Sequence, residues 1–152
     1  MKRFDAIIVG AGQAGPSLAG RLTAAGMTVA VIERHLFGGT CVNTGCTPTK
    51  TLIASAHAAH VARRAADFGV VTGPVSVDMA RVRARAAAVV SKSRDGVESW
   101  LGAMTGCTVL RGHARSMQVQ TRGLLNQDGD RGFRTKAGEA ICAARGCSSL
   151  TE

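Results

Sequence analysis

Short apolar runs and glycine-rich turns alternate along the first part of the chain. Residues 4–12, FDAIIVGAG, are typical of a buried strand that ends in a tight turn. Residues 13–26, QAGPSLAGRLTAAG, place small and apolar residues at helical spacing and end at Gly26, where a helix would stop. Residues 27–33, MTVAVIE, predict a second buried strand. Together these segments predict a β-α-β unit with parallel strands and a right-handed connection.

The middle of the chain predicts two long helices. The Ala-rich residues 49–67 have one apolar face and end near Gly69; the face consists of Leu52, Ile53, Ala56 and Ala59. Residues 75–104 predict the second helix, with Asp78 near its start, and Gly96 could interrupt it. The pattern as a whole is that of an α/β protein.

The pattern changes towards the end of the chain. Residues 107–121 are strand-like, as one strand with a kink or as a hairpin at Gly112 and His113. From Ser116 onward aliphatic residues are few and follow no clear period. We therefore expect a folded domain over 1–115 and a poorly patterned tail over 116–152, explained equally by a mobile segment or by a lost reading frame.

Charge and composition narrow the possible partners. Nineteen Lys and Arg against ten Asp and Glu give a net charge of +9, which suits anionic ligands. Arg81, Arg85 and Lys92 recur near helical spacing, as on the solvated face of an amphipathic helix. Aromatic residues make up only 3% of the chain, which disfavours base stacking and nucleic-acid binding.

The N-terminus and the cysteines indicate a compartment. An apolar run of four residues precedes Gly10, too short for a secretory signal, and no stretch approaches 18 apolar residues. These features predict a soluble, cytoplasmic protein without a membrane partner. Five cysteines are an odd number, and in a reducing compartment a close pair indicates redox chemistry or metal binding; they stand at Cys41, Cys46, Cys107, Cys142 and Cys147.

The GAGQAG motif follows the first predicted strand and opens the first helix. Gly10 would make the tight turn, Gly12 would let the backbone approach a pyrophosphate, and Gly15 would let helix and strand pack closely. Glu33, at the end of the second strand, would accept hydrogen bonds from a ribose hydroxyl pair. Because a carboxylate repels phosphate, Glu33 favours the adenosine of FAD or NAD over that of NADP.

Cys41 and Cys46 are separated by four residues in the segment GGTCVNTGCTPTK, a spacing with three possible interpretations. A zinc site would need a second pair of ligands, and His35 and His57 have no regular spacing. A structural disulfide around so small a loop would gain little entropy. A redox pair explains more, because Pro48 and the following helix place the thiols where a helix N-terminus stabilises a thiolate.

These residues together resemble the N-terminal part of the class I pyridine nucleotide-disulfide oxidoreductases. The resemblance is carried by GAGQAG, Glu33, GGTCVNTGCTPTK and the following Ala-rich helix, and it spans roughly residues 3–115. The segment CVNTGCTPTK is most similar to mercuric reductase-like members. The resemblance implies a Rossmann-like FAD-binding domain with a parallel sheet, incomplete at its C-terminal side.

The resemblance also implies a role for individual residues at the adenosine end of FAD. The pyrophosphate and the adenosine ribose would be held by Gly10, Gly12, Gly15 and Glu33. The backbone at His113 and Ala114 matches the segment that contacts the adenine in the family. The His113 side chain itself is expected at a strand end or at the surface.

Other residues match the flavin end. Gly39 and Thr40 would line the flavin side, and Lys50 matches the family lysine beside flavin N5. Cys46 would be the charge-transfer thiol, and Cys41 the interchange thiol that meets the substrate. No metal site is implied.

The family mechanism passes electrons from NAD(P)H through FAD to the Cys41–Cys46 disulfide and on to a disulfide or Hg(II) acceptor. Family members are homodimers. This chain departs from the family pattern, because a second GxGxxG and the C-terminal dimer domain are not found, and Gly129 and Asp130 lack the strand expected before a flavin-binding Gly-Asp pair. The alternative is therefore a non-catalytic flavin- or nucleotide-binding remnant.

The remaining cysteines have a simpler interpretation. Cys142 and Cys147 repeat the four-residue gap, but no helix or flavin loop surrounds them, so a second thiol pair is disfavoured. Cys107 is expected to be a small buried residue.

Overall fold

A three-stranded parallel sheet forms the base of the fold in the computed structural model, which describes residues 2–117, 131–135 and 140–144. Its strands are β2 (Ala6–Val9), β3 (Val29–Glu33) and β4 (Cys107–Arg111), in the order β2-β3-β4. Both pairs are parallel, which confirms the predicted β-α-β unit and the α/β class.

The middle strand of this sheet is its most buried element. Val29, Ala30 and Val31 are fully buried, as a strand covered on both sides should be. In β2, by contrast, Ile8 is buried but Val9 is 62% exposed, so the prediction of a buried first strand is confirmed only in part. Among the described strands, β2 pairs with β3 alone, so it is an edge strand of this sheet.

Helix α1 (Ala14–Ala24) connects β2 to β3 and covers the sheet. It ends just before Gly26, as predicted, because Gly26 adopts a positive φ of 80°. The core beneath it joins residues that are far apart in the chain: Ile8, Ala11, Ala19, Val29, Val31, Phe37 and Leu101. Phe37 and Leu101 are the large side chains that seal this core, at 1% and 0% exposure.

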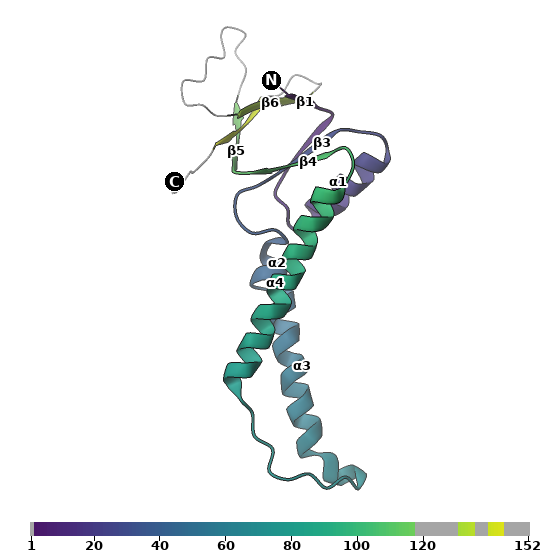
Figure 1. Ribbon diagram of the computed structural model, residues 1–152, viewed down its shortest axis with the longest axis vertical. Helices are drawn as coiled ribbons and strands as arrows, with labels where there is room; N and C mark the ends of the chain where they lie inside the picture. Colours follow the sequence, from purple (N-terminus) through teal and green to yellow (C-terminus); the bar gives the residue numbers. More distant parts are fainter. Residues whose placement is uncertain (1, 118–130, 136–139, 145–152) are drawn as a thin grey trace.

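A helical arm extends from the sheet (Figure 1). It contains α2 (Gly39–Asn43), α3 (Cys46–Arg63), a short 3-10 helix η1 (Ala65–Phe68) and α4 (Met79–Ala103). Figure 1 shows α3 and α4 side by side, with the loop between them at the far end of the arm. Arg85 fastens the two helices, because its Nη1 donates to the Thr51 carbonyl at 2.9 Å and to Ser55 Oγ at 3.1 Å.

The long helices differ from the predicted ones at several points, and the second of them begins at Met79 rather than at residue 75. The first long helix begins at Cys46 rather than at residue 49, since Pro48 lacks an N–H and fits the first turn. It ends at Arg63, where the chain tightens into η1 instead of continuing to Asp67. Gly96 does not interrupt α4, because Val90 and Leu101 are buried on either side of it and hold the helix in place.

A second sheet contains β1 (Lys2–Phe4), β5 (His113–Met117), β6 (Arg131–Thr135) and β7 (Ala140–Ala144), in the order β1-β6-β7-β5. Within the described residues 107–117, the segment is neither the predicted single kinked strand nor the predicted hairpin, because it bends at Gly112 into two strands of different sheets. The chain leaves the parallel sheet after β4 and enters the second sheet at β5, and the two strands do not pair with each other.

Two strands of the second sheet, β6 and β7, fall in the segment 116–152, where the sequence showed no period. Strand β6 pairs with β1 in parallel, and β7 pairs with β5 in an antiparallel way. Cys142 lies on β7. Gly129, Asp130 and Cys147 lie outside the described residues, and the division at residue 115 stays a prediction.

Candidate flavin and disulfide site

The glycine turn has the geometry that its sequence predicts. Gly10 has a φ of +99°, which an L side chain rarely adopts, and its N–H donates to the Ile32 carbonyl at 2.7 Å. A Cβ at Gly15 would lie 2.2 Å from the Gly10 carbonyl oxygen, so helix and strand approach as closely as backbones can. A Cβ at Gly12 would meet no atom within 4 Å, so the space beside this backbone is open.

Glu33 holds this turn in place. Its Oε2 accepts a hydrogen bond from the Ala11 N–H at 2.7 Å, and its Oε1 accepts one from the His35 N–H at 2.8 Å. Each carboxylate oxygen has a second lone pair, so both keep capacity for a hydroxyl donor. Glu33 therefore has two roles: its carboxylate fixes the turn, and the same oxygens can accept further hydrogen bonds beside the turn.

A hollow of about 360 Å³ lies at the carboxyl ends of the parallel strands. Four of the predicted adenosine-end residues line it, namely Gly10, Glu33, His113 and Ala114, together with Val9, Ile32, Arg34 and Gly112. The carboxyl ends of parallel strands are where open α/β sheets bind ligands. With the open space at Gly12 and the acid at Glu33, these residues fit the adenosine diphosphate part of FAD.

The cysteine loop is bonded directly to the glycine turn. The Gly38 N–H donates to the Ala11 carbonyl at 2.7 Å, and Gln13 Nε2 donates to the Gly38 carbonyl at 3.2 Å. A Cβ at Gly39 would lie 3.0 Å from the Gly12 Cα, so the two backbones touch with no side chain between them. The motif that would grip a diphosphate and the motif that carries the two sulfurs therefore form one structure.

Both cysteines of the motif are free thiols, and each lies on a helix. Cys41 lies within α2 and is half-buried, while Cys46 is the first residue of α3 and is exposed. The start of an 18-residue helix at Cys46 confirms that this thiol stands at a helix N-terminus.

The two thiols interact. The pKa of Cys41 lies above its ordinary value, chiefly because its side chain hydrogen-bonds with that of Cys46, and secondly because of local desolvation. The negative charge of a Cys46 thiolate raises it further, whereas the Cys46 backbone N–H and the positive charge of Lys50 lower it. The two thiols therefore act on each other, and Lys50 is close enough to act on Cys41 electrostatically.

Asn43 is a site residue that the sequence interpretation missed. Its Nδ2 donates to the carbonyls of Phe37 at 2.9 Å and Gly39 at 2.8 Å, which closes the loop before Cys41. Its Oδ1 accepts from Arg94 Nε at 2.8 Å. An amide between two cysteines in a glycine-rich loop is a signal for Asn43, but nothing local points to Arg94, which is 51 positions away.

The remaining predicted residues lie on the cysteine side. Gly39 and Thr40 begin α2, and Lys50 lies on the first turns of α3; Thr40 and Lys50 are exposed. None of the three lines the hollow at the strand ends. The structure thus groups the predicted residues into two clusters, which the contact between Gly12 and Gly39 joins.

Cys107 is half-buried against the core rather than fully buried, and burial raises the pKa of its thiol. Across the part of the chain that the structure describes, no three His, Cys, Asp or Glu side chains gather as a metal site would require. No helix within this part is long and apolar enough to cross a membrane.

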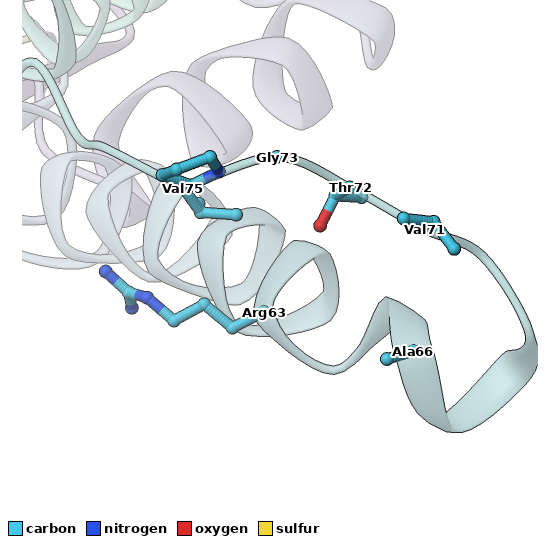
Figure 2. A pocket seen from close by; sticks show the side chains of 7 residues that line it. Arg63, Ala66, Val71, Thr72, Gly73 and Val75 are labelled. Atoms are coloured by element: carbon cyan, nitrogen blue, oxygen red, sulfur yellow. The ribbon is translucent and has the colours of Figure 1, made fainter.

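A separate hollow of about 450 Å³ lies at the far end of the arm (Figure 2). It is lined by Arg63, Ala66, Val71, Thr72, Gly73, Pro74 and Val75. Figure 2 shows the loop after η1 running back along α3 to form it. No residue of the glycine turn or the cysteine loop takes part.

Comparison with known proteins decides the family. The family model described as "Pyridine nucleotide-disulphide oxidoreductase" matches residues 4–148. The chain belongs to this family. The match extends beyond residue 115, where the sequence resemblance was expected to end, so the family pattern includes most of the tail. Proteins of this family are enzymes that use FAD and NAD(P)H.

Two curated relatives show how much of such a protein is present. The dihydrolipoyl dehydrogenase of Bacillus subtilis (strain 168) is 42% identical over 94 residues, which are 62% of this chain and 20% of that protein. That of Geobacillus stearothermophilus is 32% identical over 124 residues, 82% of this chain and 26% of that protein. The matched part of the chain therefore spans 20% to 26% of the length of these relatives.

A solved structure with the same fold is a Cu(II) complex of the HOCl-induced flavoprotein disulfide reductase RclA from Escherichia coli. It matches with a TM-score of 0.59 and 32% identity, over 82% of this chain and 26% of that one. The Cu(II) complex of a cysteine-to-serine mutant of the same reductase matches over 94% of this chain and 27% of that one, with a TM-score of 0.63 and 28% identity. The fold described above is therefore found in a flavoprotein disulfide reductase.

Proposed function

We propose that this chain forms the FAD-binding and disulfide-bearing part of an oxidoreductase that passes electrons from NAD(P)H through flavin to Cys41 and Cys46, and on to an acceptor. The observation that carries the proposal is the direct bonding of the cysteine loop to the glycine turn at Gly38 and Ala11. A sulfur pair placed this way lies beside the turn that would hold the diphosphate of the cofactor.

The residues that would hold FAD follow from the two clusters. Gly10, Gly12 and Gly15 provide the open turn, and Glu33 presents its free lone pairs to the ribose hydroxyls. His113 and Ala114 supply the far wall of the hollow. When bound, FAD would supply the two-electron carrier between NAD(P)H and the disulfide.

On the cysteine side, Gly39 and Thr40 would lie against the flavin, and Lys50 would bring a positive charge beside it. That positive charge would stabilise negative charge on a reduced cofactor. The geometry is consistent with this role, because Lys50 already acts on the Cys41 thiol within the same cluster.

Cys41 and Cys46 would reduce the acceptor by thiol–disulfide exchange, with the electrons supplied by NAD(P)H. Two electrons and two protons convert the Cys41–Cys46 disulfide into two thiols. Cys41 then attacks a substrate disulfide as the thiolate, which releases one substrate thiol and leaves a mixed disulfide. Cys46 attacks the Cys41 sulfur, which restores the protein disulfide and releases the second thiol.

The acceptor in the proposal is a small disulfide or Hg(II). A disulfide follows from the relatives, which are dihydrolipoyl dehydrogenases and a disulfide reductase. Hg(II) follows from the similarity of the CVNTGCTPTK segment to mercuric reductase-like members. It also fits the chemistry, because Hg(II) is a soft ion that binds thiolates well. We further propose a cytoplasmic location, where a reducing environment supports thiol chemistry, and a homodimer for the whole enzyme.

The decisive experiment adds FAD to the purified chain and follows its absorbance and bound stoichiometry. We expect one FAD per chain, and on reduction by dithiothreitol a long-wavelength charge-transfer band between flavin and the Cys46 thiolate. Cys46→Ser should abolish that band, whereas Cys41→Ser should retain it. A chain that binds no FAD, or a band that survives Cys46→Ser, contradicts the proposal.

A second candidate function is a flavin- or nucleotide-binding protein without turnover. The observation that favours it is that the open turn at Gly12 and the hollow beside Glu33 could bind a nucleotide without the cysteines. It predicts bound FAD but no oxidation of NADPH when a disulfide or Hg(II) is offered. Measured NADPH oxidation that depends on Cys41 would exclude it.

A further inference from the structure

Among the described residues, Arg94 makes the one long-range side-chain hydrogen bond to the segment between the two cysteines. It lies in α4, is half-buried, and donates from Nε to Asn43 Oδ1 at 2.8 Å. Asn43 is the last residue of α2 and stands between Cys41 and Cys46 in the chain. The contact therefore connects the long helix of the arm to the sulfur pair.

The chemistry of Asn43 allows only one orientation of its amide. Both Nδ2 hydrogens are donated, to the carbonyls of Phe37 and Gly39. If the amide were turned over, its nitrogen would face the Arg94 donor and its oxygen would face two carbonyls, so all three hydrogen bonds would be lost. Arg94 and the two carbonyls therefore favour the same orientation of the amide, the one in which Asn43 closes the loop.

The loop that Asn43 closes determines where Cys41 lies. The carbonyls of Phe37 and Gly39 flank Gly38, whose N–H is bonded to the glycine turn. Cys41 follows within the same short helix, and five residues is too short for α2 to be stable without such contacts. The distance between the two sulfurs therefore depends on the Asn43 amide.

We propose that Arg94 is a positioning residue of the Cys41–Cys46 pair, whose side chains it keeps within reach of each other through Asn43. This inference rests on the proposed function, because it assumes that the pair cycles between dithiol and disulfide. Arg94 acts by geometry: the cation whose charge acts on the Cys41 thiol is Lys50, and Arg94 is not among the groups that do so. No other described residue donates to the Asn43 oxygen.

The test is the equilibrium between the protein dithiol with oxidised glutathione and the protein disulfide with two reduced glutathiones, measured on the full chain by alkylation and mass spectrometry. Two thiols kept within reach of each other have a high effective concentration, so Arg94→Met should lower the equilibrium constant by about tenfold, the effect of losing one hydrogen bond from a charged donor. Arg94→Lys, which keeps a donor, should restore most of it.

Two controls separate positioning from a general effect on the fold. Arg83→Leu changes an exposed arginine on the same helix that makes no hydrogen bond to the described residues, and should leave the constant unchanged. Asn43→Ala should lower the constant as Arg94→Met does, and the double variant should be no lower than Asn43→Ala alone. If Arg94→Met does not fold, Arg94→Gln is the variant to be measured.

Additive effects of Arg94→Met and Asn43→Ala, or an unchanged constant in Arg94→Met, would overturn the inference. Hydrogen exchange of residues 37–45 gives a readout that does not depend on redox chemistry, and it should become faster in Arg94→Met but not in Arg83→Leu. If the wild-type pair forms no disulfide while this exchange changes as expected, the proposed function fails and the positioning by Arg94 stands. Unchanged exchange would reject the positioning itself.

Discussion

At the scale of single residues, Gly12 and Gly15 allow folding and cofactor binding to be separated. Gly15→Ala would place a Cβ 2.2 Å from the Gly10 carbonyl oxygen, which is backbone and cannot move aside. We expect a loss of about 3 kcal/mol in the free energy of unfolding, at the upper end of overpacking. Urea denaturation followed by circular dichroism measures it.

Gly12→Ala is the matched variant. Its Cβ would meet no atom of the protein within 4 Å, so the free energy of unfolding should change by less than about 1 kcal/mol. If a pyrophosphate lies against this backbone, the same methyl group should lower the affinity for FAD by at least about tenfold. Normal FAD binding by Gly12→Ala would place the diphosphate elsewhere.

The pH dependence of Cys41 is a second residue-scale prediction. Because its pKa lies above the ordinary value, the rate at which iodoacetamide modifies Cys41 should rise to its plateau at a higher pH than that of a free cysteine. Cys46→Ala removes the largest cause of the shift, so the midpoint should move down. Lys50→Met removes a positive charge that lowers the pKa, so the midpoint should move up.

Site-resolved mass spectrometry distinguishes Cys41 from the other cysteines in this experiment. Equal midpoints in the wild type and in Cys46→Ala would show that Cys46 does not raise the pKa of Cys41. A downward shift in Lys50→Met would contradict the expectation that the positive charge of Lys50 lowers the pKa of Cys41.

At the scale of secondary-structure elements, Gly96 weakens α4 without interrupting it. The residue is exposed, and an added Cβ would meet nothing within 4 Å. Gly96→Ala should therefore raise the free energy of unfolding by about 0.5–1 kcal/mol, since alanine loses less backbone entropy in a helix. Gly26→Ala is the control with the opposite sign, because Gly26 has a positive φ of 80°.

Prediction from sequence was most accurate for elements whose partners are close along the chain. Three elements depend mainly on contacts between neighbouring segments of the chain: the glycine turn, the β-α-β unit and the helix that begins near Cys46. Hydrophobic periodicity and turn residues indicate such contacts directly. The Arg94–Asn43 contact was missed because one polar residue on a helix does not indicate its partner 51 positions away. The strands β6 and β7 were missed because their stability comes from pairing with β1 and β5.

At the scale of the whole molecule, the C-terminal part of the chain completes a sheet that begins with its first residues. Strand β1 pairs only with β6, and β5 pairs only with β7, among the described strands. A chain that ends at residue 117 should keep the parallel sheet and the arm but lose protection of β1 and β5 in hydrogen exchange. If β1 and β5 stay protected in that shortened chain, the pairing with β6 and β7 does not stabilise them.

The bend at Gly112 has a consequence for how this molecule would respond to heating. One wall of the hollow at the strand ends comes from the parallel sheet and the other from β5, which belongs to the second sheet. The Gly112 N–H, at the bend between the two sheets, donates to the Glu33 carbonyl at 2.9 Å. A nucleotide that touches both walls binds only when both sheets are folded, so it couples them energetically. Calorimetry should then show two overlapping transitions merging into a single sharper one as FAD is added.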